Sequence, residues 1–255
     1  MQQQKTGSRR VAFVTGASQG LGAAIAAALA RGGFDLAVSS RRAQKLAGMI
    51  AELAPTGARV VPVELDVRSQ SSLERAMSEA VGAFGHIDVL VNNAGVTLRR
   101  PVLEVTPAEW DEVMAVNLKG TFFLSQQMGR HLITSRRAGC IISLASAHGM
   151  LGFPQRSAYG ISKAGIIHMT RMLAIEWAEH GIRVNAIAPG TVETPSRAEY
   201  FSTHPDARQA MLDRIPLRRF GTPDEVAAMV CYLTSPEAAY ITGQTLLLDG
   251  GLTTY

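Results

Sequence analysis

The chain alternates short runs rich in β-branched residues with alanine-rich helical stretches along its whole length. This alternation is typical of βαβ units, in which each helix connects two parallel strands of one sheet. The pattern predicts seven strands, near residues 10–15, 34–39, 59–65, 87–91, 139–145, 182–188 and 244–248, and six main helices, near residues 20–31, 43–53, 70–84, 107–134, 157–180 and 223–234. The predicted fold class is therefore α/β with a parallel sheet.

Length and apolar content fit one domain. The 255 residues, 47% of them hydrophobic, are enough to bury one large core, so we predict a single domain over residues 1–255. Within it, residues 1–9 are expected to be a flexible leader. Residues 190–222 contain Pro195, Pro205 and Pro216 among charged and aromatic residues, and are interpreted as a mobile lid over the substrate.

Charge and apolar patterning argue against several partner classes. The net charge is +4 and the pI is near 9.3, yet the arginines occur as scattered pairs rather than as one basic stripe, so we expect no nucleic-acid partner. No apolar stretch approaches the ~20 residues that span a bilayer, so we expect no membrane partner. The first ten residues lack the apolar core of a secretory signal, which favours a cytoplasmic location. The two cysteines have no metal-ligand spacing, and no metal site is predicted.

A glycine-rich turn between the first predicted strand and the first predicted helix indicates nucleotide binding. Gly16, Gly20 and Gly22 lie in TGASQGLG, where glycine lets backbone N–H groups approach a pyrophosphate at the positive end of a helix. A tight strand-to-helix turn alone would explain two of the three glycines. The position at the start of a βαβ unit favours the nucleotide interpretation.

The end of the second predicted strand predicts which nicotinamide cofactor binds. NAD-binding sites place an acidic side chain there to accept hydrogen bonds from the ribose 2′-hydroxyl. This chain has Ser40 and Arg41 instead, which suit a 2′-phosphate, so we predict NADP(H) over NAD(H). The alternative is that Arg41 and Arg42 only cap a solvated turn. Asp66, after the third predicted strand, is placed to accept a hydrogen bond from the adenine amino group.

Tyr159 and Lys163 form the candidate reacting pair. They lie four residues apart in SAYGISKAG and share one face of a predicted helix, with Ser146 thirteen residues upstream of Tyr159. A phenol with an ordinary pKa of ~10 needs a shift of roughly three units, about 4 kcal/mol, to exchange a proton near neutral pH. An ammonium ~4 Å away supplies about that amount at an effective dielectric of ~20. Taken alone, the pair also fits an ordinary helix face with an exposed lysine.

Six features occur in the order and at the separations of a known family: TGASQGLG, the NNAG of residues 92–95, Asn117, Ser146, the Tyr159–Lys163 pair, and the APG of residues 188–190. The chain resembles the short-chain dehydrogenase/reductase family over essentially its whole length. The resemblance implies a single-domain, Rossmann-type doubly wound parallel sheet with helices on both faces. It also implies an enzyme that transfers a hydride between the nicotinamide of NADP(H) and a carbonyl or secondary alcohol.

The resemblance implies roles for individual residues. Tyr159 is expected to be the general acid or base, and Lys163 to lower its pKa and hold the nicotinamide ribose. Ser146 is expected to bind the reacting oxygen, and Asn117 to hold a water that connects Lys163 to solvent. The expected cofactor contacts are Gly16, Ser18, Gln19, Gly20, Leu21, Ser40, Arg41, Asp66, Val67, Asn93, Ala94, Gly95, Tyr159, Lys163, Pro189, Gly190, Val192 and Thr194. Gln19 departs from the family pattern, since many NADP-binding relatives have a basic residue there.

The substrate is predicted less directly. The stretches around Arg99 and Glu193 are similar to those of relatives that act on sugar acids and short hydroxy acids, where an arginine meets the substrate carboxylate. Arg99 and Arg100 are candidates for that contact, as are Arg156 and Arg197. The candidate pocket residues are His148, Met150, Leu151, Phe153, Arg156, Glu193, Arg197 and Tyr200.

Two alternative functions stay open. One is reduction of a 3-oxoacyl group on acyl carrier protein, which requires a basic docking patch to which Arg130, Arg136 and Arg137 are candidates to contribute. The other is a non-catalytic nucleotide-binding protein, which the joint presence of Ser146 and the Tyr159–Lys163 pair disfavours. By analogy with relatives, the chain is expected to form a homotetramer through the long helices near 107–134 and 157–180 and its last strand and helix.

Overall fold

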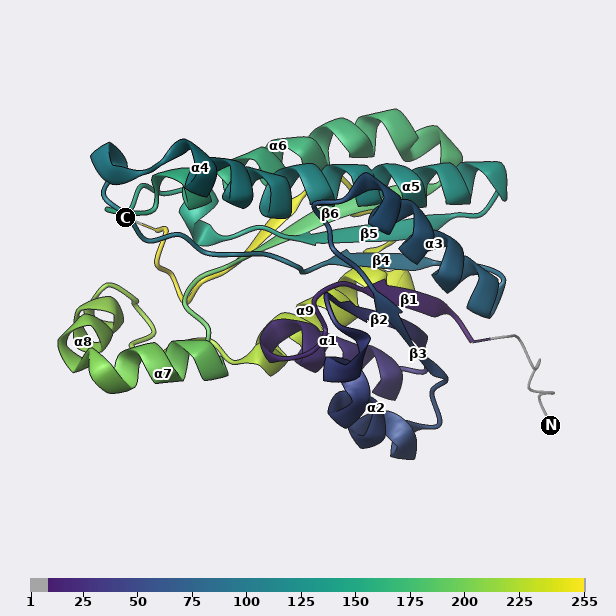
Figure 1. Cartoon of the computed structure of the whole chain (residues 1–255), viewed down its shortest axis with the longest axis horizontal. Helices are drawn as coiled ribbons and strands as arrows, with labels where there is room; N and C mark the ends of the chain where they lie inside the picture. Colours follow the sequence, from purple (N-terminus) through teal and green to yellow (C-terminus); the bar gives the residue numbers. More distant parts are fainter. Residues whose placement is uncertain (1–8, 255) are drawn as a thin grey trace.

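Seven parallel strands form one central sheet in the structure, a computed structural model that describes residues 9–254 (Figure 1). The strands are β1 (Val11–Val14), β2 (Asp35–Ser40), β3 (Val60–Glu64), β4 (Val89–Asn92), β5 (Gly139–Leu144), β6 (Ile182–Pro189) and β7 (Thr245–Leu248). Their order across the sheet is β3-β2-β1-β4-β5-β6-β7, and every neighbouring pair is parallel. The predicted α/β class is confirmed. Residues 1–8 of the predicted leader lie outside the described residues.

Helices cover both faces of the sheet, as Figure 1 shows. One layer holds α3 (Gln70–Phe84), α4 (Pro107–Met114), α5 (Gly120–Thr134) and α6 (Ser157–Trp177), and the other holds α1 (Gly20–Arg31), α2 (Ala47–Leu53) and α9 (Pro223–Thr234). Side chains alternate between the two cores: Val11 and Phe13 pack with the first layer, whereas Ala12 and Val14 pack with the second. A sheet buried on both faces explains why its strands are nearly continuous apolar runs.

The strand order reverses between β1 and β4, which places a crevice at the carboxyl edge of the sheet. The loops after β1, β4, β5 and β6 all leave from that edge. The candidate cofactor-binding and reacting residues lie on these loops, at the ends of β2 and β3 on the same edge, or on α6, which begins there. Asn117 lies on the turn between α4 and α5. The topology therefore gathers segments that are far apart in the sequence.

The segment 190–222, predicted as a lid, contains two helices that the sequence interpretation did not identify. They are α7 (Pro195–Thr203) and α8 (Pro205–Asp213), which stand away from the sheet in Figure 1. The base of the segment is closed by a bridge between Val192 and Gly221. Phe201 and Phe220 form a small separate core with Ala147, Ile215 and Leu252. The motion expected of a lid stays a prediction.

The long helix predicted over 107–134 is interrupted. A π-helical turn, Ala115–Lys119, separates α4 from α5 and contains Asn117. Such turns occur frequently at functional sites, because they displace the backbone locally. Among the described residues, no helix is both long and apolar enough to cross a membrane.

Candidate active site

Ser146, Tyr159 and Lys163 line one cavity of about 420 Å³ at the carboxyl edge of the sheet. Ser146 follows β5 and caps a short 3₁₀ turn, Ala147–Gly149, through its hydroxyl. Tyr159 and Lys163 project from the first two turns of α6. Ser146 lies close enough to the Tyr159 phenol for its hydroxyl to affect the pKa of that phenol. The three residues that the sequence singled out are thus brought together, while their catalytic roles stay predictions.

The pKa of the Tyr159 phenol is shifted upward, whereas the sequence-based expectation was a lowered pKa. Its pKa is raised above the ordinary value, because burial disfavours the phenolate. The Ser146 hydroxyl and the positive charges of Arg156 and Arg197 act in the opposite direction. Lys163, the expected cause of a lowered pKa, is not among the causes, although its Nζ lies 5.7 Å from the centre of the phenol ring. In the protein alone, Tyr159 is therefore protonated at neutral pH.

Lys163 is a buried ammonium. Its Nζ donates a hydrogen bond to the Leu144 carbonyl at 2.6 Å. Burial lowers the pKa of Lys163 to about 8, since the charged form loses solvation. A Cβ atom at Gly95 would lie 3.8 Å from Nζ and 3.3 Å from Oδ1 of Asn117, so all three residues meet at one point.

Asn117 lies beneath the cavity rather than in its lining. Its Nδ2 donates to the Val96 carbonyl at 2.9 Å and to the Ser162 hydroxyl at 3.1 Å, and its Oδ1 accepts from the Val96 N–H at 2.8 Å. The side chain is fully buried. These bonds tie the π-helical turn to the loop after β4 and to α6. Asn117 therefore holds in place the backbone and side chains that surround Lys163.

His148 and Phe153 do not line the cavity, in contrast to the sequence-based expectation. The His148 ring lies behind the site, edge-on to Tyr159 with centroids 6.0 Å apart and to Phe153 with centroids 5.2 Å apart. Its Nδ1 lies 3.4 Å from the Ser146 hydroxyl, and its backbone N–H donates to that hydroxyl at 3.2 Å. Burial and three nearby arginines lower the pKa of His148 to about 4, so the ring is neutral at pH 7. Phe153 lies under the guanidinium of Arg214.

Three arginines line the same cavity: Arg99, Arg156 and Arg197. Within residues 9–254, no ion pair involves any of them. Arg100, the fourth candidate, is instead paired with Glu109 at 2.6 Å outside the cavity. Arg156 and Arg197 are partly buried, and a carboxylate or another anionic ligand would neutralise their charges.

A cleft for an elongated ligand runs from this cavity across the glycine turn. A second cavity shares Leu21, Gly95 and Thr194 with the first and continues over β1. Gly16 and Gly20 have φ values of +64° and +59°, a conformation that favours glycine. The predicted cofactor contacts in this second cavity are Gly16, Ser18, Gln19, Gly20, Leu21, Ser40, Arg41, Asp66, Val67, Asn93, Ala94, Gly95 and Thr194. Pro189, Gly190, Val192 and Thr194 line the first.

The far end of the cleft is basic. A third cavity is lined by Ser18, Gln19, Ser40, Arg41, Arg42 and Lys45. The Ser40 hydroxyl donates to the Arg42 carbonyl at 2.5 Å and accepts from the Arg42 N–H at 3.2 Å. The Ser40 hydroxyl proton is therefore not available to a bound phosphate. A phosphate there would therefore be bound mainly by the three cations. Arg42 and Lys45 were missed as candidates, although their closeness to Arg41 in the sequence was a usable signal.

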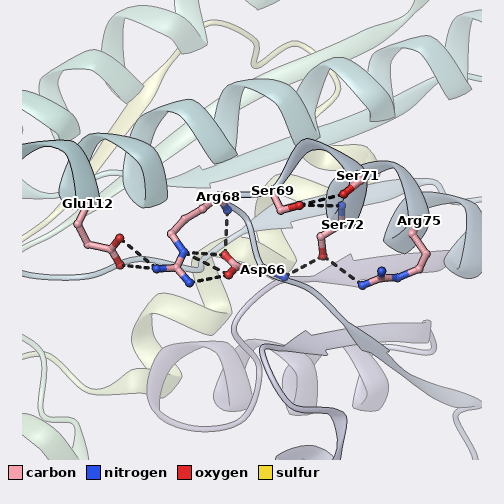
Figure 2. Close-up of polar contacts among 7 residues, drawn as sticks. All are labelled: Asp66, Arg68, Ser69, Ser71, Ser72, Arg75 and Glu112. Carbon is pink, nitrogen blue, oxygen red and sulfur yellow. Dashed lines mark hydrogen bonds and ion pairs between the residues drawn. The ribbon is translucent and has the colours of Figure 1, made fainter. Parts of the chain in front are cut away.

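Asp66 is held by a residue that the sequence interpretation overlooked. Figure 2 shows Arg68 between Asp66 and Glu112. The Nη2 of Arg68 donates to Oδ2 of Asp66 at 2.6 Å, and its Nη1 donates to Glu112 at 3.2 Å. The Arg68 hydrogen bonds lower the pKa of Asp66 below its ordinary value. Asp66 is thus an ionised acceptor in the cleft, shared between Arg68 and any ligand amino group. Arg68 also links the loop after β3 to α4.

The chain is similar to known proteins over almost its full length. A family model described as Enoyl-(Acyl carrier protein) reductase matches residues 16–253. A 3-oxoacyl-(acyl-carrier-protein) reductase of Thermotoga maritima is 38% identical over 243 residues, which is 95% of this chain and 97% of the relative.

Two solved structures share the whole fold. A protein from Sinorhizobium meliloti, provisionally named a short-chain alcohol dehydrogenase, is 42% identical with a TM-score of 0.92 and 96% coverage of both chains. A protein from Agrobacterium tumefaciens with bound NADP, provisionally named 2-deoxy-D-gluconate 3-dehydrogenase, is 36% identical with a TM-score of 0.89, over 96% of this chain and 97% of that one.

Proposed function

The chain belongs to the short-chain dehydrogenase/reductase family, and we propose that it transfers a hydride between NADP(H) and the carbonyl or secondary alcohol of a small hydroxy acid or sugar acid. As a member of that family it is an oxidoreductase that acts on CH–OH or C=O groups. One observation carries the choice of an acid: Arg156 and Arg197 line the cavity beside Tyr159 without an acidic partner in the described chain.

The cleft supports NADP(H) as the cofactor. The glycine turn suits a pyrophosphate at the start of α1, and the basic cavity at Arg41, Arg42 and Lys45 suits a 2′-phosphate. The Agrobacterium relative binds NADP. When bound, the cofactor supplies or accepts the hydride. The nicotinamide would lie against the residues after β6, at Pro189 and Gly190, which line the reacting cavity.

The chain's own residues would handle the proton. Tyr159, protonated in the protein alone, suits a general acid that donates its phenol proton to the carbonyl oxygen during reduction. Ser146 would bind the same oxygen and orient it. Lys163 would keep a positive charge close to the developing phenolate, and Asn117 would hold the π-helical turn beside Lys163. In oxidation, the same groups act in reverse.

A homotetramer is the proposed assembly. Large apolar side chains are exposed on α5 and α6, at Phe122, Ile161 and Met172, and near β7, at Tyr240 and Leu247. Contiguous exposed apolar surface typically marks a protein interface. Sedimentation equilibrium would test this assembly, and a monomer at micromolar concentration would refute it.

Reduction of a carrier-bound 3-oxoacyl group is the second candidate, because the Thermotoga relative carries that name. The proposed docking patch is weaker than the sequence suggested, since Arg137 is paired with Asp88 at 2.7 Å. A non-catalytic role is disfavoured, because Ser146, Tyr159 and Lys163 line one cavity together.

Oxidation of NADPH at 340 nm tests the proposal. We expect faster reduction of small oxo acids and sugar oxo acids than of acetoacetyl thioesters, compared by kcat/KM. Faster thioester reduction would favour the carrier-protein function. No oxidation with any carbonyl compound, despite NADPH binding, would favour the non-catalytic role.

A further inference from the structure

We propose that the substrate is a short 2- or 3-oxo acid, or the corresponding hydroxy acid, whose carboxylate lies within two bonds of the reacting carbon and is bound between Arg156 and Arg197. The inference rests on the proposed function and refines its substrate class. It follows from where the two guanidinium groups lie relative to Tyr159 and from the side chain that crosses the mouth of the cavity. We call Arg156 and Arg197 the arginine pair.

Arg156 is fixed beside the reacting tyrosine. It occupies the position just before α6, three residues ahead of Tyr159. Its guanidinium lies 6.0 Å from the centre of the Tyr159 ring, and its Nη1 donates to the Leu98 carbonyl at 3.2 Å. One hydrogen bond leaves several of its five N–H groups for a ligand. An anion bound to Arg156 would therefore lie close to the atom that Tyr159 protonates.

Arg197 approaches from the opposite wall, on α7. Its guanidinium lies 5.7 Å from the centre of the Phe201 ring, and Phe201 is stacked on Phe220 with centroids 5.2 Å apart. The aromatic stack belongs to the small core of the lid segment, which holds α7 in place. The aromatic stack therefore packs behind Arg197, which lines the same cavity as Tyr159 and whose charge acts on the phenol.

The two guanidinium groups destabilise each other until an anion binds. Burial lowers the pKa of Arg156 and of Arg197, and the charge of Arg197 lowers the pKa of Arg156 further. Both side chains are half-buried, and neither forms an ion pair within the described chain. A carboxylate between them would relieve the repulsion and accept charge-assisted hydrogen bonds from both. Their closeness to Tyr159 places this carboxylate beside the reacting carbon.

The Arg99 side chain crosses the mouth of the cavity and narrows it, which limits the substrate's length. Arg99 donates from Nε to Oε1 of Gln155 at 3.0 Å and from Nη1 to the Tyr200 hydroxyl. These contacts join the loop after β4 to α7 across the mouth. The cavity of about 420 Å³ would also have to accept the nicotinamide. A long acid, or a thioester on a carrier arm, would have to break the Arg99–Tyr200 contact.

Three isomeric oxo acids of equal size and charge test how far the carboxylate lies from the reacting carbon. We would measure kcat/KM with NADPH for 2-, 3- and 4-oxopentanoate and for their methyl esters. We expect the 2- or 3-oxo isomer to exceed the 4-oxo isomer at least tenfold, and its ester to lose at least tenfold. Equal rates for the 4-oxo isomer, or for the esters, would overturn the inference while leaving the oxidoreductase assignment intact.

Variants of the arginine pair test the contact itself. Arg156→Leu and Arg197→Leu should each lower kcat/KM for the preferred oxo acid at least 100-fold, mostly through KM, while changing the ester rate less than threefold. Arg156→Lys should restore part of the loss. Arg75→Leu, which removes an exposed charge on α3, is the matched control and should change neither rate. Equal losses on acid and ester would indicate a structural effect and refute the contact.

A binding measurement tests the arginine pair independently of the proposed oxidoreductase activity. Calorimetric titration of the three isomers into the protein with NADP⁺ requires no turnover. A preference for the 2- or 3-oxo isomer that Arg197→Leu abolishes would support the arginine pair even if no substrate were reduced. Equal or absent binding of all isomers would overturn it.

Discussion

Replacing Arg41 with alanine should weaken NADPH binding and leave NADH binding nearly unchanged. Arg41 lines the basic cavity with Arg42 and Lys45, and the Ser40 hydroxyl there is already bonded to the Arg42 backbone. The charge of Arg41 also reaches Asp66, whose pKa it helps to lower. Arg41 thus lies between the proposed phosphate and adenine sites, where only NADPH presents a phosphate.

The size of the effect follows from the contact that is lost. A hydrogen bond to a charged group contributes about 1.5–3 kcal/mol, which corresponds to roughly 10–150-fold in Kd. Because Arg42 and Lys45 remain, we expect the lower part of that range, about 10–30-fold. Arg41 is exposed, so the loss should shrink as salt is raised from ~0.05 to ~0.5 M.

Calorimetric titration with NADPH and with NADH, at both salt concentrations, measures the effect. Ser40→Asp is the reciprocal change: it adds a carboxylate that repels the phosphate, and should favour NADH. Arg75→Ala controls for loss of net charge. Equal losses for NADPH and NADH in Arg41→Ala would refute the reasoning, because Arg41 would then support the adenosine rather than the phosphate.

Three further outcomes are expected. Gly22→Ala would bring its Cβ within 2.3 Å of the Gly16 carbonyl, so we expect at least tenfold weaker NADPH binding and a lower melting temperature. The control Gly82→Ala, with open space around it, should be neutral or stabilising. His148 has a pKa of about 4 in the folded protein, below its unfolded value of 6.5. The unfolded chain therefore binds more protons between these pH values, and the free energy of unfolding falls as pH drops through that window. In urea unfolding, His148→Phe should flatten this dependence by at most about 1.4 kcal/mol per pH unit, and an unchanged slope would contradict the assignment. Phe201→Ala should remove the support of Arg197 and raise KM for the oxo acid at least tenfold, while leaving the Kd of NADPH within threefold.

Much of the fold was predictable because its signals are local. The apolar run at Val11–Val14, the glycines after it and the helix that follows begin a βαβ unit that can be identified without tertiary information. The same holds for the Tyr159–Lys163 spacing, since both side chains project from one helix. These local signals predicted the seven strands and the three residues that meet in the cavity.

The remainder depends on contacts that the sequence pattern does not contain. Pro195 and Pro205 were interpreted as loop residues, but each begins a helix, a position where the missing N–H costs nothing. The π-helical turn at Asn117 interrupts a continuous helical pattern. The raised pKa of Tyr159 arises from burial, which depends on the whole tertiary structure. Arg68 became visible as a cleft residue only through its bonds to Asp66 and Glu112.

Proton transfer by Tyr159 is the central claim, and the Tyr159→Phe variant tests it most directly. The measurement is single-turnover oxidation of NADPH with the preferred oxo acid, beside the Kd of NADPH. We predict a rate loss of about 10²–10⁴-fold with a Kd of NADPH that changes less than threefold, because the variant loses the phenol oxygen that donates the proton while the other expected cofactor contacts remain. A rate within threefold of the wild type would contradict the account.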